Sequence, residues 1–200
     1  MACLLLFIVY KFNVFFQGYL KCVGVPCNPI SLFEGLQPYI KTTYASGCGD
    51  TRCNNSHGFA EAVRISIEAD AVVVVAGLDL SQEDEGRDRV SLLLPGRQMD
   101  LITAVSSASE RPIILILLAG GPVDVSFAKV NPKIGSILWI GYPGETGGQA
   151  VAEIIFGEFN PGLYLESSLN VEHSLTFFHK EIYWMMFERN RWAFANHLVS

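Results

Sequence analysis

The sequence predicts an α/β fold: a three-layer sandwich in which a mostly parallel sheet carries helices on both faces. Three observations predict it. Between residues 59 and 157 the chain repeats helix, apolar strand and loop three times. The strands have almost no polar residues, which is typical of strands buried on both faces. Each strand is followed by glycine, and parallel strands end at one edge of a sheet, so their loops are expected to converge.

The composition fits one ordinary domain with poorly matching ends. Of the 200 residues, 50% are hydrophobic and 17% are charged, which is enough apolar material for a substantial core. The formal net charge is −6 and no basic stripe occurs, so we exclude nucleic acid as a partner. We divide the chain into an atypical segment 1–22, a domain 23–162 and a divergent, partly helical tail 163–200.

The N-terminal segment begins with an apolar run from Ala2 to Tyr10 that is too short to span a bilayer. It lacks the basic start and the small-residue cleavage site of a signal peptide. We therefore favour a buried strand or a terminus outside the domain, and we predict no membrane partner.

Residues 23–57 are rich in turn-forming residues and are predicted to be loop, with one short strand from Ile40 to Tyr44. All five cysteines lie within the first 53 residues. The spacing of Cys48 and Cys53 does not suit a zinc site, whereas a disulfide in an oxidising compartment would suit it. Asn54 begins a glycosylation sequon directly after them.

The first repeat contains a helix from Phe59 to Ala69, with Ser56 as its expected cap. Its apolar positions predict an inward face made of Phe59, Ala62, Val63, Ser66 and Ile67. A strand from Ala71 to Ala76 follows. The second and third repeats predict a helix at 97–107, strands at 113–118 and 134–140, and a helix at 149–156.

The tail changes character after residue 162. Aromatic residues and methionines crowd residues 175–197, whose periodicity predicts one helix. This helix would be apolar on so many sides that it must pack on the domain or form a patch for association.

The loop after the valine-rich strand is the main candidate for chemistry. Ligands in open α/β sheets bind beyond the carboxyl ends of the strands. Residues 79–89 carry five carboxylates and two arginines: Asp79, Glu83, Asp84, Glu85 and Asp88, with Arg87 and Arg89. Taken alone, such a cluster is most often a solvated loop.

Seven segments together give the cluster a more specific meaning. They are GVPCNP (24–29), ASGCGD (45–50), GLDLSQEDEGRDR (77–89), LLLPGRQ (92–98), AGGPVDVSFAK (119–129), ILWIGYPGETGG (137–148) and FGEFNPG (156–162). In this order and spacing they resemble the C-terminal α/β sandwich domain of family 3 glycoside hydrolases. The resemblance is to the plant β-xylosidase and α-arabinofuranosidase branch.

The resemblance implies a retaining mechanism that uses two carboxyl groups about 5–5.5 Å apart. The family's sandwich domain supplies the general acid/base, and its (β/α)8 barrel supplies the aspartate nucleophile. By position in the loop motif, Glu83 is the candidate acid/base and Glu85 the runner-up. Arg89 and Asp88 are expected to pin the loop. The resemblance implies no cofactor and no metal, and it pairs Cys48 with Cys53.

The implied substrates are xylo- or arabino-oligosaccharides, and the implied location is extracellular, at the cell wall. No nucleophile motif occurs in the 200 residues, so we expect the chain to need a separate barrel domain and to be inactive alone. The alternatives are a non-catalytic module that binds a carbohydrate or a protein partner, and an unrelated flavodoxin-like nucleotide binder. The second is disfavoured because no phosphate-binding loop is present.

Overall fold

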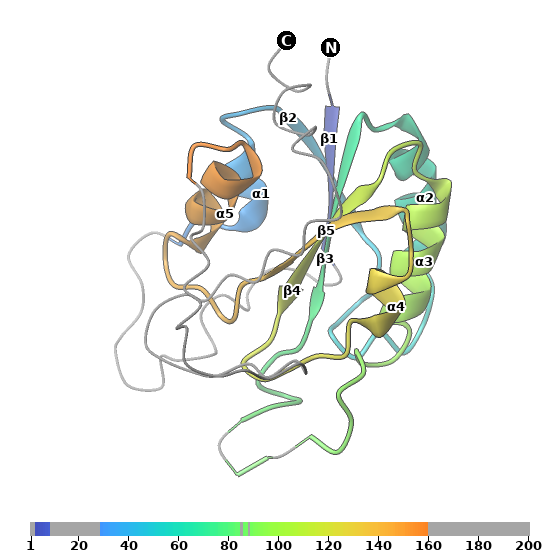
Figure 1. The fold of residues 1–200 in the computed structure, drawn as a ribbon, viewed down its shortest axis with the longest axis vertical. Coiled ribbons are helices and arrows are strands. Elements are labelled where there is room, and N and C mark those ends of the chain that lie inside the picture. Colours follow the sequence, from blue (N-terminus) through green and yellow to red (C-terminus); the bar gives the residue numbers. More distant parts are fainter. Residues whose placement is uncertain (1–2, 9–28, 85, 88, 160–200) are drawn as a thin grey trace, which may run out of the picture.

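The computed structural model describes residues 3–8, 29–84, 86–87 and 89–159 (Figure 1). Five parallel strands form one sheet in the order β2-β1-β3-β4-β5. The strands are β1 (Cys3–Ile8), β2 (Lys41–Ser46), β3 (Ala71–Gly77), β4 (Ile113–Leu118) and β5 (Ile134–Trp139). The helices are α1 (Leu32–Leu36), α2 (Phe59–Glu68), α3 (Gln98–Ala108), α4 (Ser126–Lys129) and α5 (Gly147–Ile155).

The predicted three-layer sandwich is confirmed. Helices α1 and α5 cover one face of the sheet, and α2, α3 and α4 cover the other (Figure 1). Successive β3 side chains alternate between the two cores: Val72 and Val74 pack with α2 and α3, whereas Val73 and Val75 pack with α1 and α5. Burial on both faces explains why this strand contains no polar residue.

The strand order places the acidic loop at the point where the chain changes direction across the sheet. From β1 the chain first moves to β2 on one side and then returns to β3 on the other. In open α/β sheets, ligands bind beyond the carboxyl ends of the two strands that flank this point. The loop that leaves β3 begins at Gly77, so the topology supports it as the place for a site.

Helix α1 corrects the prediction that residues 23–57 are loop with one strand. Ser31 and Glu34 form a capping box: the Ser31 hydroxyl accepts from the Glu34 amide, and the Glu34 carboxylate accepts from the Ser31 amide. The Ser31 amide and the Ser31 hydroxyl both donate to the Glu34 carboxylate, and these two bonds lower the pKa of Glu34. The helix packs closely on α5, since a Cβ added at Gly35 would lie 2.2 Å from the Gly148 carbonyl oxygen.

Two details of α2 also differ from the prediction. The N-cap is Gly58, which makes no side-chain capping bond, and Ser56 contributes only its carbonyl oxygen, to the Phe59 amide. Ile67 is 54% exposed, and Ile65 takes the inward position instead. The strand option for the N-terminal segment is confirmed by β1, and the predicted strand at 40–44 by β2. The helix predicted at 175–197 lies outside the described residues.

Candidate active site at the carboxyl edge of the sheet

The loops after β3, β4 and β5 meet at the carboxyl edge of the sheet, as predicted. A carboxylate, Glu83, lies where they meet. Its side chain accepts hydrogen bonds from residues of both neighbouring loops, Gly120 after β4 and Tyr142 after β5. The Glu83 carboxyl group therefore connects, through hydrogen bonds, the loops that follow β3, β4 and β5, which lie far apart in the sequence.

A compact turn fixes the point from which the Glu83 side chain projects. The amides of Gln82 and Glu83 donate to the Asp79 carbonyl oxygen at 2.9 and 3.1 Å. The Asp79 carboxylate accepts from the Ser81 amide at 2.8 Å, and the Asp79 amide donates to the Gln82 side chain. Asp79 thus stabilises the turn in the way that aspartates commonly do at such positions, and its carboxylate is committed to structure.

The two carboxylate oxygens of Glu83 have different partners. Oε1 accepts from the Gly120 amide and from the Tyr142 hydroxyl. Oε2 lies 3.3 Å from Nε of Arg89, and both side chains are mostly buried, with exposed fractions of 14% and 12%. These contacts suit the carboxylate form, because ionised acceptors strengthen bonds from hydroxyl, amide and guanidinium donors.

Arg89 contacts two other residues at the far end of the acidic loop, which is in line with the prediction that it pins the loop. Besides the contact with Glu83, its guanidinium donates to the carbonyl oxygen of Pro122 in the loop after β4. The Arg87 guanidinium donates to Ser81 at the exposed rim of the loop. The side chains of Glu85 and Asp88 lie outside the described residues, so their predicted roles are untested.

Glycines in the loop after β4 leave space for the side chains of Glu83, Arg89 and Tyr142. A Cβ at Gly120 would lie 3.2 Å from the Tyr142 ring and 3.3 Å from Glu83 Oε1, and one at Gly121 would lie 3.3 Å from Arg89. At the end of β3, Gly77 has φ +145°, and a Cβ there would lie 1.9 Å from the Leu118 carbonyl oxygen. The glycines at the ends of β3 and β4 thus permit a close approach that a larger residue would hinder.

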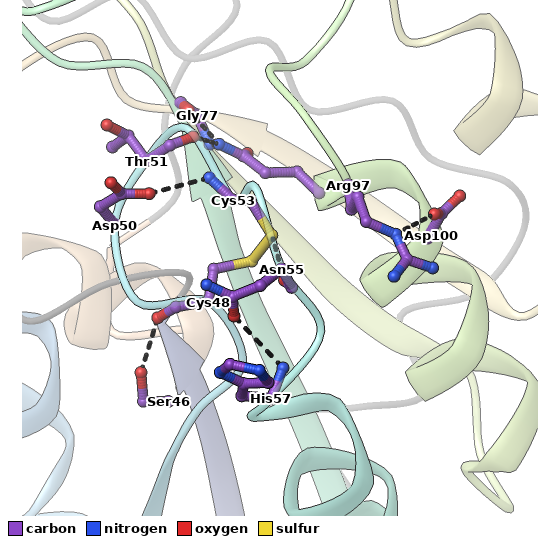
Figure 2. Close-up of a disulfide and its surroundings, with 11 residues drawn as sticks. Ser46, Cys48, Asp50, Thr51, Cys53, Asn55, His57, Gly77, Arg97 and Asp100 are labelled. Carbon is purple, nitrogen blue, oxygen red and sulfur yellow. Dashed lines mark hydrogen bonds and ion pairs between the residues drawn. A yellow bond between two sulfur atoms is a disulfide. The ribbon is translucent and has the colours of Figure 1, made fainter.

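A second loop, closed by a disulfide, lies beside Gly77 at the end of β3 (Figure 2). Cys48 and Cys53 form a disulfide, as the resemblance implied, and both are buried. The Thr51 hydroxyl, inside the closed loop, donates to the Asp79 carboxylate at 2.6 Å. The disulfide-closed segment is therefore attached to the turn that carries Glu83.

Gln98, at the start of α3, joins the two loops through the core. Its fully buried amide donates to the carbonyl oxygens of Thr51 and Gly77 at 2.5 and 2.8 Å, and it accepts from the Gly77 amide at 2.9 Å. A buried side-chain amide is costly unless it is bonded in this way. Gln98 therefore fixes the end of β3 against the closed loop.

Sequence reasoning did not identify Tyr142, Gly120 or Gln98 as partners of the acidic loop. Tyr142 and Gly120 lie in the loops after β5 and β4, and both donate to the Glu83 carboxylate. The signal for Gln98 was a polar residue at the start of a helix whose next turn is apolar. Such a residue faces the core and needs a partner there.

The part of the chain that the structure describes contains neither a group of metal ligands nor a membrane-spanning helix. Within it, no three histidine, cysteine or acidic residues are grouped so that they could hold a metal ion. The helices of the same ranges are all too short or too polar to cross a bilayer.

The chain is similar to known proteins over most of its length. The family model for the glycosyl hydrolase family 3 C-terminal domain matches residues 15–181. Probable beta-D-xylosidase 6 of Arabidopsis thaliana is 64% identical over 140 residues, which cover 70% of this chain and 18% of the relative. Beta-xylosidase/alpha-L-arabinofuranosidase 1 of Medicago sativa subsp. varia is 49% identical over 138 residues, with shares of 69% and 18%.

A solved structure of the same family also resembles this chain. The family 3 exo-beta-xylosidase XlnD, in complex with a xylobiose aziridine activity-based probe, superposes with a TM-score of 0.73 at 31% identity. The match covers 79% of this chain and 20% of the XlnD chain. The chain therefore spans about a fifth of the length of the relatives that it matches.

Proposed function

Since the chain belongs to glycosyl hydrolase family 3 and matches its C-terminal domain, we propose that it is the acid/base-bearing domain of a retaining exo-glycosidase. The substrates would be xylo- or arabino-oligosaccharides, in line with the names of its relatives. The observation that carries this proposal is a mostly buried carboxyl group, Glu83, at the meeting point of three strand-end loops.

In this mechanism Glu83 acts twice. As an acid it gives its proton to the glycosidic oxygen, which takes the electron pair of the breaking bond while a second carboxylate bonds to the anomeric carbon. As a base it then takes a proton from the water whose oxygen attacks that carbon and releases the second carboxylate. The described contacts of Glu83 suit the base form.

The acid form requires one contact of Glu83 to loosen. A proton on Oε2 would weaken the contact with the Arg89 guanidinium, because an uncharged oxygen is a poorer acceptor, and the Oε2–Nε distance of 3.3 Å already exceeds the usual 2.7–2.9 Å of a charge-assisted bond. This contact is therefore the one that we expect to open when substrate binds. The two bonds to Oε1 would remain and keep the carboxyl group in place.

The second carboxyl group must come from elsewhere in the enzyme. Asp79 bonds to Thr51 and Ser81 and is committed to the turn, so it is a poor nucleophile candidate. We assign the nucleophile to a barrel domain, and we expect the 200-residue chain by itself to hydrolyse no glycoside. Turnover of an aryl β-xyloside by the purified chain, well above that of its Glu83→Gln variant, would contradict this expectation.

The acid/base assignment can be tested in a full-length chimera. Residues 29–159 would replace the matching segment of the Arabidopsis relative, giving an enzyme to compare with Glu83→Gln and Glu85→Gln variants. We expect Glu83→Gln to lower kcat/KM on xylobiose by about 10²–10⁴-fold. Azide should restore turnover of an activated aryl xyloside, because this nucleophile needs no general base.

Glu61→Gln is the matched control, since Glu61 lies on the exposed surface of α2 and pairs only with Arg64 in the described structure. The same loss with azide rescue in Glu85→Gln, and not in Glu83→Gln, would move the assignment to Glu85. If neither variant differed from the control, the non-catalytic binding module would be the better proposal.

We also propose that the domain works outside the cell, at the cell wall. A disulfide persists in oxidising compartments, and Asn54 of the adjacent sequon is exposed and accessible to a glycan. Peptide mapping of the protein from a plant host should find Cys48 bonded to Cys53 and a glycan on Asn54. Free thiols at both cysteines would contradict the proposal.

A further inference from the structure

The two oxygens of the Glu83 carboxyl group are held unequally. A carboxylate oxygen has two lone pairs and can therefore accept two hydrogen bonds. Oε1 accepts one bond from the Gly120 amide and another from the Tyr142 hydroxyl, so both of its lone pairs are used. Oε2 faces Nε of Arg89 at 3.3 Å, which is longer than a normal charge-assisted bond. The site thus distinguishes two oxygens that are equivalent in the free side chain.

The end of β5 directs the Tyr142 hydroxyl toward Oε1. Ile140 still belongs to the sheet, because its amide donates to the Leu117 carbonyl oxygen at 2.9 Å. The chain then turns at Gly141, whose φ of +57° favours glycine, and the Tyr142 ring packs on the core between the sheet and helices α1 and α5. The ring also lies close to the Gly120 backbone, since a Cβ added there would be 3.2 Å from it. The sheet and this core therefore fix the direction of the hydroxyl.

We propose that Tyr142 is a positioning residue for the acid/base: together with the Gly120 amide, its hydroxyl places the proton of Glu83 on Oε2. This inference rests on the proposed function. A proton on Oε1 would use one of the lone pairs that accept from Gly120 and Tyr142, so one of these two bonds would be lost. A proton on Oε2 weakens only the longer contact with Arg89, and both bonds to Oε1 remain.

Oε2 then exchanges the proton in both steps of the reaction. In the first step the O–H bond at Oε2 breaks, and its proton moves to the glycosidic oxygen, which leaves with the electron pair of the glycosidic bond. In the second step Oε2 takes a proton from the attacking water, which restores the acid form. The Tyr142 hydroxyl donates to Oε1 throughout and neither gains nor loses a proton. Gly121 leaves space beside Oε2, since a Cβ added there would lie 3.6 Å from this oxygen.

The test compares two substrates in the full-length chimera. The leaving group of xylobiose needs a proton, whereas that of an activated aryl β-xyloside departs without one. We expect Tyr142→Phe to lower kcat/KM by about tenfold on xylobiose and by less than about twofold on the aryl xyloside, because the ring stays and only the placement of the proton is lost. Tyr39→Phe is the matched control, since the Tyr39 hydroxyl also donates to a glutamate, Glu158, but on the exposed surface. This variant should change neither value.

The same change in a Glu83→Gln background separates positioning from a structural role. The Glu83→Gln variant has no acid proton to place, so adding Tyr142→Phe should lower kcat/KM on xylobiose by less than about twofold further. Equal losses on the two substrates would overturn the inference, because a general distortion of the site acts on both. An equal loss with and without Glu83→Gln would also overturn it, since Tyr142 would then act independently of the carboxyl group.

The Glu83→Gln variant also distinguishes a failure of this inference from a failure of the proposed function. If Glu83→Gln lost activity with azide rescue while Tyr142→Phe matched the Tyr39→Phe control, the positioning role would be wrong and the proposed function would stand. If Glu83→Gln lost no activity on xylobiose, the proposed function would be wrong, and the positioning role with it.

Discussion

Two loops at the carboxyl edge of the sheet are held in opposite ways. The loop closed by the Cys48–Cys53 disulfide is stabilised within its own six residues, since the Cys53 amide also donates to the backbone and the carboxylate of Asp50. The acidic loop after β3 depends on distant partners. Glu83 is bonded to residues 37 and 59 positions further along the chain, Gly120 and Tyr142.

One loop is therefore held by contacts within its own sequence, and the other by contacts made only in the folded protein. The closed loop limits its own conformations even in the unfolded chain, because the disulfide is a covalent constraint. The turn that carries Glu83 is local, but its carboxyl group gains the partners Gly120 and Tyr142 only when β3, β4 and β5 are side by side. Gln98 bonds to Thr51 in the closed loop and to Gly77 at the start of the acidic loop. Its removal should therefore lower the free energy of unfolding more than the other changes that follow.

Gln98→Ala should lower the free energy of unfolding by about 3 kcal/mol, since it removes three buried hydrogen bonds. Urea unfolding of the 200-residue chain would measure it. Gln149→Ala is the matched control, because the Gln149 amide bonds only to Glu153 in the described structure, on the exposed surface of α5. A loss no larger than that of the control would show that the loops are not coupled through Gln98.

A double variant with Cys48→Ser and Cys53→Ser should have a free energy of unfolding about 2 kcal/mol lower than the parent chain. This is the chain-entropy value for a disulfide that closes a loop of six residues. The same unfolding experiment measures the loss. Reductant should destabilise the parent chain by a similar amount and leave the double variant unchanged. A further loss in the double variant on reduction would mean that another cysteine pair contributes.

Tyr142→Phe should cost about 1 kcal/mol, because it removes one hydrogen bond to Glu83 and leaves the ring in place. Tyr39→Phe is the control, since the Tyr39 hydroxyl also donates to a glutamate, Glu158, but on the exposed surface. If the two variants lost equal stability, the bond to Glu83 would be no more important than a surface bond.

The smallest effect concerns the Asp124 carboxylate, which lies in the loop between β4 and α4. Hydrogen bonds from the Ser126 side chain and amide lower the pKa of Asp124 below 3.8. The folded state therefore gains stability above the unfolded pKa and loses it as the pH falls through the folded pKa. When the pH is lowered from about 6 to about 3, the free energy of unfolding should therefore fall. The Asp124→Asn variant should lose less of this free energy than the parent chain, by under about 1 kcal/mol. An unchanged pH dependence of urea unfolding would contradict this.

Most of the fold could be predicted because its signals are local. The apolar strands and glycine turns located β3, β4 and β5, since burial on both faces excludes polar residues, and the periodic apolar positions located α2, α3 and α5. The four-residue helix α4, between β4 and β5, was not predicted. Helix α1 was missed although Ser31 and Glu34 formed a visible capping-box pattern. The preceding Gly- and Pro-rich composition obscured a helix of only five residues.

The sequence by itself determined the sandwich, the acidic loop and the resemblance that selects Glu83. Strand burial and loop composition depend on neighbouring residues, and the resemblance depends on the order of short motifs along the chain. The tertiary structure alone decided the partners of that carboxyl group. No local pattern connects Glu83 with Gly120 and Tyr142, since the parallel register brings their loops together only after the strands have paired. Hydrogen bonds between such distant groups depend on the assembled sheet, and they cannot be inferred from sequence spacing.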